Sequence, residues 1–166
     1  MSLITYTTYD SVRLVLGVDD LELSNEQLSM PYISHTVDKA LASVSGVLSP
    51  DTEERTLSGQ YAYLSGLGSL TSAQTLVKNE IEVYVTYLAA AEAGVSLQMQ
   101  APKTKSDGKA LSTRFSSDAT FLAGVERIYS KIAVAKAYLI EALGGTIENI
   151  PSIATSSPSE DLVTNS

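Results

Sequence analysis

The chain has 166 residues, 44% of them apolar, and a formal net charge of −8. This length fits a single domain with a buried core. The acidic balance argues against a general nucleic-acid binder, because neutralising phosphates requires lysine and arginine. The absence of cysteine excludes disulfides and thiolate metal sites. No secretory signal is expected at the N-terminus, and the most apolar stretch, residues 132–143, is too short to span a bilayer.

Two helix signals open the chain. Residues 11–16 form a short segment with an apolar edge, which Asp10 is placed to cap and Gly17 to end in a left-handed conformation. Ser24 and Gln27 then have the spacing of a capping box, which predicts the start of a second helix.

Further along, apolar residues recur at helical spacing. Pro31 is expected to break or restart the second helix. Gly66 and Gly68 are expected to interrupt the helical pattern. Gly94 is expected to close a long alanine-rich helix, and Asp118 to cap the last helix. The helices predicted after Pro31 span residues 33–48, 52–64, 71–93 and 119–143.

Residues 95–115 change from helical spacing to alternation. Two alternating runs flank Asp107-Gly108, a dipeptide typical of tight turns, which predicts a β-hairpin over about 95–115. Four of the eleven basic residues of the chain fall in this segment, namely Lys103, Lys105, Lys109 and Arg114. They either keep a solvated loop from pairing with other strands, or bind an acidic partner or the DNA backbone by charge.

Residues 146–166 are rich in serine and threonine and contain no lysine or arginine. Such a segment has too little apolar surface to fold alone, so we predict a flexible C-terminal arm. Three residues of the arm are spaced as if to dock on another surface, namely Ile147, Ile150 and Ile153. The predicted fold is therefore mainly α, a helical bundle over residues 1–145 with one inserted β-hairpin and an extended arm over 146–166.

Residue types that support catalysis are scarce. His35 is the single histidine, so a catalytic triad would have to use it, and a zinc site would need carboxylates alone. Gly66-Leu67-Gly68 lacks the third glycine of a dinucleotide fingerprint and the lysine of a phosphate loop. The adjacent carboxylates of Asp19-Asp20 and of Glu53-Glu54 would point apart on a helix. We therefore expect no enzymatic activity, no cofactor and no metal.

Tyrosine outnumbers phenylalanine by nine to two. Its apolar ring and polar tip suit partly exposed core positions and subunit interfaces equally well. Tyr6 and Tyr9, which precede the first predicted helix, are therefore open to both interpretations.

The beginning of the chain resembles tailed-bacteriophage head-to-tail connector (adaptor) proteins. The resemblance lies in Leu16-Gly17-Val18 after a short helix, the acidic linker Asp19-Asp20, and the capped helix start over Ser24–Gln27. The order of the remaining elements is also similar to that family, with a hairpin between two long helices and a C-terminal arm.

This resemblance implies a structural adaptor of the phage neck. The family forms a ring, commonly of twelve copies, that joins the portal of the DNA-filled head to the tail and leaves a channel. Genomic DNA passes through this channel without specific binding. The arm would reach the portal protein or a neighbouring subunit, and the hairpin would contact other neck or tail proteins. Such a protein is assembled in the host cytoplasm and located in the virion, with no membrane partner.

A function from a different class stays open beside the adaptor. The basic residues of the predicted hairpin also suit a DNA-binding packaging subunit, whose affinity for DNA would fall steeply with salt.

Overall fold

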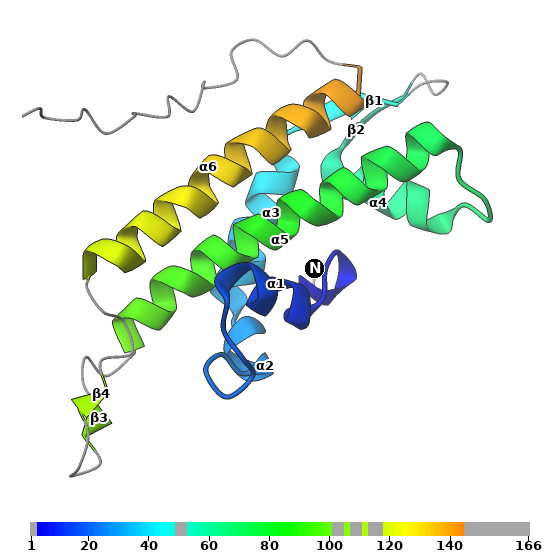
Figure 1. The fold of residues 1–166 in the computed structure, drawn as a ribbon. Coiled ribbons are helices and arrows are strands. Elements are labelled where there is room, and N and C mark those ends of the chain that lie inside the picture. Colours follow the sequence, from blue (N-terminus) through cyan, green and yellow to red (C-terminus); the bar gives the residue numbers. More distant parts are fainter. Residues whose placement is uncertain (1–2, 49–52, 101–104, 107–110, 113–117, 145–166) are drawn as a thin grey trace, which may run out of the picture.

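The computed structural model describes residues 3–48, 53–100, 105–106, 111–112 and 118–144 (Figure 1). The fold is mainly α-helical, as the sequence predicts. The elements in chain order are η1 (Leu3–Thr5), α1 (Tyr9–Leu16), α2 (Asn25–Leu28), α3 (Pro31–Ala42), β1 (Ser45–Val47), β2 (Glu54–Thr56), α4 (Leu57–Gly66), α5 (Ser72–Gln100), β3 (Lys105–Ser106), β4 (Leu111–Ser112) and α6 (Asp118–Ala142).

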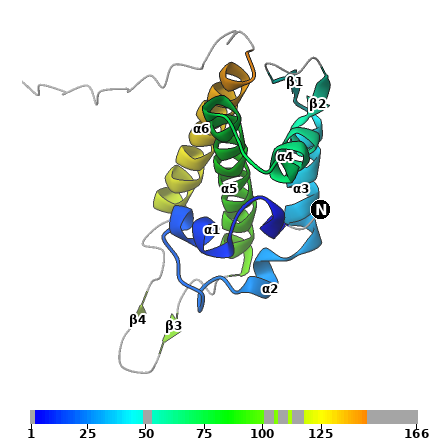
Figure 2. The same ribbon diagram turned by 90° about the vertical axis from the view of Figure 1, so that its right-hand side faces the viewer.

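Helix α5 lies at the centre of the molecule, and α6 packs antiparallel along one side of it (Figure 1). Helix α5 buries Ile81 and Val85, and α6 buries Ala135 and Leu139, each pair four residues apart on one helix face. Helices α1, α3 and α4 also pack against α5, as the rotated view shows (Figure 2). Helix α5 therefore contacts each of the other α-helices.

Helix α5 continues to Gln100, so the prediction that Gly94 closes it is wrong. A Cβ at Gly94 would meet Leu16 Cδ2 of α1 at 3.2 Å. The glycine thus permits a close approach of α1, a packing role that its place in the sequence does not distinguish from a helix end. Residues 95–99, predicted as a strand, form the last turns of this helix.

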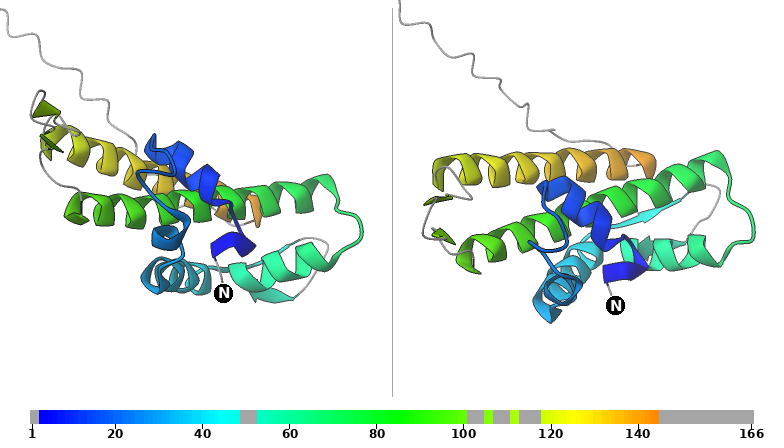
Figure 3. Two further views of the ribbon diagram at one scale, coloured as in Figure 1. Left: turned by 90° about the horizontal axis from the view of Figure 1, so that it is seen from below. Right: turned by 60° about the horizontal axis from the view of Figure 1, so that its bottom comes forward.

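A β-hairpin does connect the two long helices, as predicted, but its strands begin only after α5 has ended. Strands β3 and β4 pair antiparallel, with Lys105 opposite Ser112 and Ser106 opposite Leu111. The hairpin lies at the end of the α5–α6 pair, away from α3 and α4 (Figure 3).

Helix α1 begins two residues before the predicted start, and its cap is Thr8 rather than Asp10. The Ser11 amide donates to Thr8 Oγ1 at 3.1 Å, and Thr8 has the extended backbone that a cap requires. Asp10 lies in the first turn, where its charge still favours the helix N-terminus. Gly17 ends the helix at φ 68°, as predicted.

The predicted capping box of α2 is confirmed. The Gln27 amide donates to Ser24 Oγ at 3.3 Å, and the Ser24 amide donates to Gln27 Oε1 at 2.8 Å. Helix α2 ends after one turn, and α3 starts with Pro31 as its first residue. Proline suits this position because the amide that it lacks would have no partner within the helix.

The predicted helix over residues 33–48 ends at Ala42. Strand β1 follows and pairs antiparallel with β2, a hairpin that the periodicity did not reveal. Val44 and Leu48 are buried at the two ends of β1, so they also fit a helical stripe when read by spacing alone. A Cβ at Gly46 would meet the Leu143 side chain at 3.2 Å, so this glycine lets the end of α6 lie against β1.

Helix α4 starts at Leu57, later than the predicted residue 52, because β2 occupies residues 54–56. Its predicted face of Leu57, Tyr61 and Leu64 is buried, which confirms that part of the prediction. The Gln60 side chain, also buried, donates from Nε2 to the Gly46 carbonyl oxygen at 2.9 Å and joins α4 to β1.

The last predicted helix is confirmed as α6, with Asp118 as its first residue rather than its cap. Gly144 follows at φ 77°. Within the described residues, no helix is both long and apolar enough to cross a bilayer. The predicted arm over 146–166 lies outside the described residues.

Candidate functional site

The residues predicted to bind partners fall mostly outside the described part of the chain. The structure places Lys105 as the first residue of β3. The other predicted partner-binding residues lie outside the described part of the chain, namely Lys103, Lys109, Arg114, Ile147, Ile150 and Ile153. Binding by the hairpin or by the isoleucines therefore stays a prediction.

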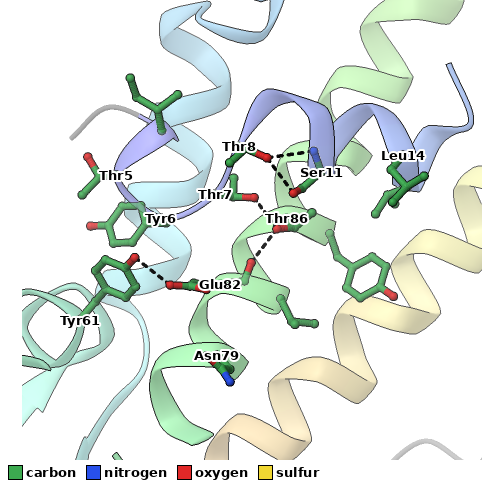
Figure 4. Close-up of a pocket in the computed structure, with 14 residues that line it drawn as sticks. Thr5, Tyr6, Thr7, Thr8, Ser11, Leu14, Tyr61, Asn79, Glu82 and Thr86 are labelled. Carbon is green, nitrogen blue, oxygen red and sulfur yellow. Dashed lines mark hydrogen bonds between the residues drawn. The ribbon is translucent and has the colours of Figure 1, made fainter. Parts of the chain in front are cut away.

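The structure does contain a groove of about 620 Å³ between the N-terminal segment and α5. Residues 4–8 and α1 form one wall of this N-terminal groove, α5 forms the other, and Tyr61 of α4 contributes from the side (Figure 4). The lining residues of α5 recur every three to four positions, so they share one face of the helix: Asn79, Glu82, Val83, Thr86 and Tyr87.

Hydroxyl groups form the floor of the N-terminal groove (Figure 4). Thr86 Oγ1 donates to the Glu82 carbonyl oxygen at 2.7 Å and lies 2.6 Å from Thr7 Oγ1. A hydroxyl carries a single proton, so Thr7 is the donor in the pair with Thr86. The Tyr61 hydroxyl donates to Glu82 Oε1 at 3.0 Å. These bonds link the N-terminal segment and α4 to adjacent turns of α5.

Two tyrosines stabilise this floor. The rings of Tyr6 and Tyr61 meet edge to face, with centroids 4.9 Å apart. Burial, and then the hydrogen bond to Glu82, raise the pKa of Tyr61 to about 12. Burial likewise raises the pKa of Tyr6, with a smaller contribution from the Asp38 carboxylate. Both hydroxyls therefore stay protonated near neutral pH, which makes Tyr61 a stable donor rather than a base or nucleophile.

Apolar side chains form the rim of the N-terminal groove and are left uncovered. Ile4, Leu14 and Val83 line it with exposed fractions of 59%, 82% and 42%. Single exposed apolar residues are ordinary, but three around one groove make a surface that an apolar partner can cover.

The charge of the N-terminal groove is low. In the described part of the chain, its lining contains no lysine or arginine, and its single ionisable carboxyl, Glu82, already accepts a hydrogen bond from Tyr61. A phosphate or nucleic-acid backbone would find no cation among these lining residues. The chemistry of the lining suits an uncharged segment with apolar side chains.

A buried arginine holds α1 in place as a wall of the groove. Arg13 is 7% exposed; its Nε donates to the Leu23 carbonyl oxygen at 2.8 Å, and its Nη1 donates to Asp10 Oδ1 at 2.8 Å. Nη2 donates to Asn25 Oδ1. The guanidinium thus ties α1 to the connector and to the start of α2, which sequence reasoning did not foresee.

A second, acidic hollow of about 1010 Å³ adjoins the N-terminal groove and shares Ile4, Thr7, Thr8 and Leu14 with its lining. Asp19, Asp20 and Glu26 line it, and the cation at its edge, Arg13, is engaged in the contacts described above. The acidic lining of this hollow therefore repels polyanions.

The described residues bring together no group of three His, Cys, Asp or Glu side chains able to hold a metal ion. His35 lies exposed on α3, apart from the groove lining. The functional groups at the groove are hydroxyls, the Asn79 amide, apolar side chains and one hydrogen-bonded carboxylate, which suit polypeptide binding.

The tyrosines divide between the core and the surface, and a role in subunit interfaces stays a prediction. Tyr6, Tyr61 and Tyr84 are buried in the core, whereas four others are at least a third exposed: Tyr32, Tyr63, Tyr129 and Tyr138. The unusual density of threonine and tyrosine over residues 5–9 was the one sequence signal of the groove. That signal does not reveal which helix these residues face.

Comparisons of the chain with protein-family models, with curated proteins and with solved structures find no match. The functional assignment therefore depends on the chain's own geometry and on the resemblance of its opening motif.

Proposed function

We propose that the chain is a non-enzymatic structural adaptor that assembles as a ring in the neck of a tailed phage. In this role it joins the portal of the DNA-filled head to the tail and leaves a channel for DNA. The resemblance of residues 9–28 to head-to-tail connector proteins suggests the role. The order of the elements supports it, with α1 ended by Gly17, a capping box, and a hairpin between two long helices.

The observation that carries the proposal is the uncovered rim of the N-terminal groove. Ile4, Leu14 and Val83 are large apolar residues that leave surface in water. A protein that covers such surface gains about 25 cal/mol for each Å². This favours a function in assembly, where one protein surface buries another.

The charge of the chain fits a channel for DNA. A net charge of −8 favours repulsion of the phosphate backbone, so DNA slides past without being captured. The acidic hollow beside α1 adds to this effect.

The proposal is tested by light scattering and electron microscopy of the purified full-length chain over a range of concentrations. We expect annular particles and a mass that is a multiple of the chain mass. Leu14→Asp places a charge on the groove rim and should weaken assembly. Leu21→Asp is the matched control, because Leu21 is 92% exposed and lies outside the groove lining. A chain that stays monomeric at every concentration contradicts the proposal.

A DNA-binding experiment separates the adaptor from the alternative packaging subunit. The adaptor is expected to bind duplex DNA weakly at all salt concentrations. Strong binding that falls steeply with salt, and that is lost when Lys103, Lys105 and Lys109 are replaced by Gln, would establish the packaging subunit instead.

The predicted arm has its own test within this proposal. Deletion of residues 146–166 is expected to prevent the chain from joining its portal, because these residues include the isoleucines predicted to dock. If the truncated chain joins the portal as the full chain does, the arm has no such role.

A further inference from the structure

We propose that the apolar rim shared by the N-terminal groove and the acidic hollow binds a cationic amphipathic segment of a different protein. Such a segment carries apolar side chains on one side and lysines or arginines on the adjoining side. The proposal goes beyond the adaptor function, because it identifies a partner by its chemistry and holds whether or not copies of the chain form a ring.

The shared rim consists of Ile4 and Leu14, which line both hollows. Their exposed fractions of 59% and 82% leave most of each side chain in water. Val18 adds a partly buried apolar side chain to the lining of the acidic hollow. Covering the shared rim releases water from apolar surface, so its occupant should present apolar side chains.

The charge beside the shared rim selects a cationic occupant. Four carboxylates line the acidic hollow, namely Asp10, Asp19, Asp20 and Glu26. Arg13 is 7% exposed, and its guanidinium already donates to the Leu23 carbonyl oxygen, to Asp10 and to Asn25. The described lining therefore carries a net charge of −3. A lysine or arginine that enters the hollow gains an attraction that Arg13 does not neutralise.

Two of these carboxylates have no counter-ion. Within the described residues, neither Asp20 nor Glu26 forms an ion pair, and both are exposed. The same part of the chain brings together no three acidic side chains able to hold one metal ion. The carboxylates are therefore spread along the hollow, and a matching ligand needs several separate cations. A polypeptide with more than one lysine or arginine meets this requirement, whereas a single metal ion does not.

The C-terminal segment of the chain has the wrong charge for this surface. Residues 146–166 contain three acidic residues and no basic residue. The acidic hollow repels such a segment, whether it comes from the same copy or from a second one. Nucleic acid is disfavoured for the same reason.

The hairpin between α5 and α6 has the right charge but the wrong arrangement. Lys105 pairs with Ser112, and Ser106 pairs with Leu111. Because successive strand residues point to opposite faces, Lys105 and Leu111 lie on opposite faces of the hairpin. One face therefore cannot bring a cation to the hollow and an apolar side chain to the shared rim. The ribbon views also place β3 and β4 apart from α1 and α2 (Figure 1, Figure 3).

The proposal is tested with three labelled synthetic peptides and the purified full-length chain. The first peptide has leucines on one helix face and lysines on the other, the second has serines in place of the leucines, and the third has glutamates in place of the lysines. Fluorescence anisotropy measures binding. We expect the leucine–lysine peptide to bind with an affinity that falls as salt is raised, and the other two to bind at least about tenfold more weakly. Equal affinity of the serine–lysine peptide would show attraction by charge alone and would overturn the proposal.

Two double variants locate the charged part of the site. Asp19→Asn with Asp20→Asn removes two charges from the hollow and keeps the Asp19 oxygen that accepts the Glu22 amide at 2.9 Å. Glu126→Gln with Glu141→Gln, both exposed on α6, gives the same net charge. We expect the first to weaken binding of the leucine–lysine peptide at least about tenfold and the second less than about threefold. Equal losses would mean that the peptide follows the overall charge of the chain, which would overturn the proposal.

Ile4→Ser and Leu76→Ser form the matched pair for the apolar part. The two side chains are 59% and 51% exposed, and Ile4 lines both hollows whereas Leu76 lies outside their described lining. We expect Ile4→Ser to weaken binding at least about threefold and Leu76→Ser to leave it unchanged. An equal loss with Leu76→Ser would overturn the proposal.

A last variant tests the hairpin as the competing occupant. If the hairpin of the same or a neighbouring copy filled the hollow, replacing Lys103, Lys105 and Lys109 by Gln would free it for the peptide. We expect the affinity to change by less than about threefold, and a larger rise would overturn the proposal. Light scattering on the same samples reports assembly separately. Rings of a chain that does not bind the peptide would overturn this proposal alone, whereas binding by a chain that stays monomeric would support it and contradict the adaptor function.

Discussion

The Tyr61 hydroxyl donates a 3.0 Å hydrogen bond to the Glu82 carboxylate and ties α4 to α5. One turn further along α5, Thr86 meets Thr7 of the N-terminal segment at 2.6 Å. The floor of the N-terminal groove thus depends on contacts between residues 21 and 79 positions apart in the chain. Its rigidity can be tested one bond at a time.

Removal of the Tyr61 hydroxyl should lower stability. Tyr61→Phe keeps the buried ring but deprives Glu82 of a donor, so we expect a loss of about 1–2 kcal/mol in the free energy of unfolding, measured by urea denaturation. Tyr138→Phe is the matched control, because Tyr138 is 53% exposed, and it should change stability by less than about 0.5 kcal/mol. Equal effects of the two variants would mean that the Tyr61–Glu82 bond contributes nothing.

The raised pKa of Tyr61 leads us to expect a loss of stability at alkaline pH. The pKa of Tyr61 is raised from 10.0 to about 12 by burial, so folding favours the protonated hydroxyl. Its contribution is fully present below pH 10 and is lost as the pH rises toward 12. The difference in unfolding free energy between the natural chain and Tyr61→Phe should therefore shrink across this window. Tyr84, whose pKa burial also raises, is present in both proteins and leaves the difference unaffected.

Arg13 should matter more than its position on a short helix suggests. Arg13→Ala removes the donor to the Leu23 carbonyl oxygen and to Asn25, and we expect a loss of about 2–3 kcal/mol by chemical denaturation. Asp10→Ala removes the ion pair of an exposed carboxylate and a favourable charge at the N-terminus of α1, and should cost about 1 kcal/mol. If Asp10→Ala costs as much as Arg13→Ala, the buried contacts of Arg13 are not the stabilising ones.

Gly17 and Gly66 should respond to alanine with opposite signs. Gly17 ends α1 at φ 68° with open space around it, so Gly17→Ala strains only the backbone and should cost about 1 kcal/mol. Gly66 is the last residue of α4, also with open space around it, and Gly66→Ala should raise stability by about 0.5 kcal/mol. Thermal unfolding of both variants checks the pair, and a gain at Gly17 would contradict the assigned cap.

Features set by neighbouring residues could be predicted from the sequence. The capping box of Ser24 and Gln27, the helix end at Gly17 and the helix start at Pro31 depend on hydrogen bonds or torsions within a few positions. The long helices were also predictable, because buried residues such as Ile81 and Val85 recur at helical spacing. The mainly helical fold follows from these local preferences alone.

Only the tertiary structure decided which segments that are distant in the sequence pack against each other. Gly94 stays inside α5 because α1 packs on it, and Gly46 lies in a strand because β2 pairs with it and α6 ends against it. The N-terminal groove exists only because Thr7 and Tyr61 meet adjacent turns of α5. Such contacts depend on how elements pack, and a side chain's spacing along the chain carries no information about which distant surface it will meet.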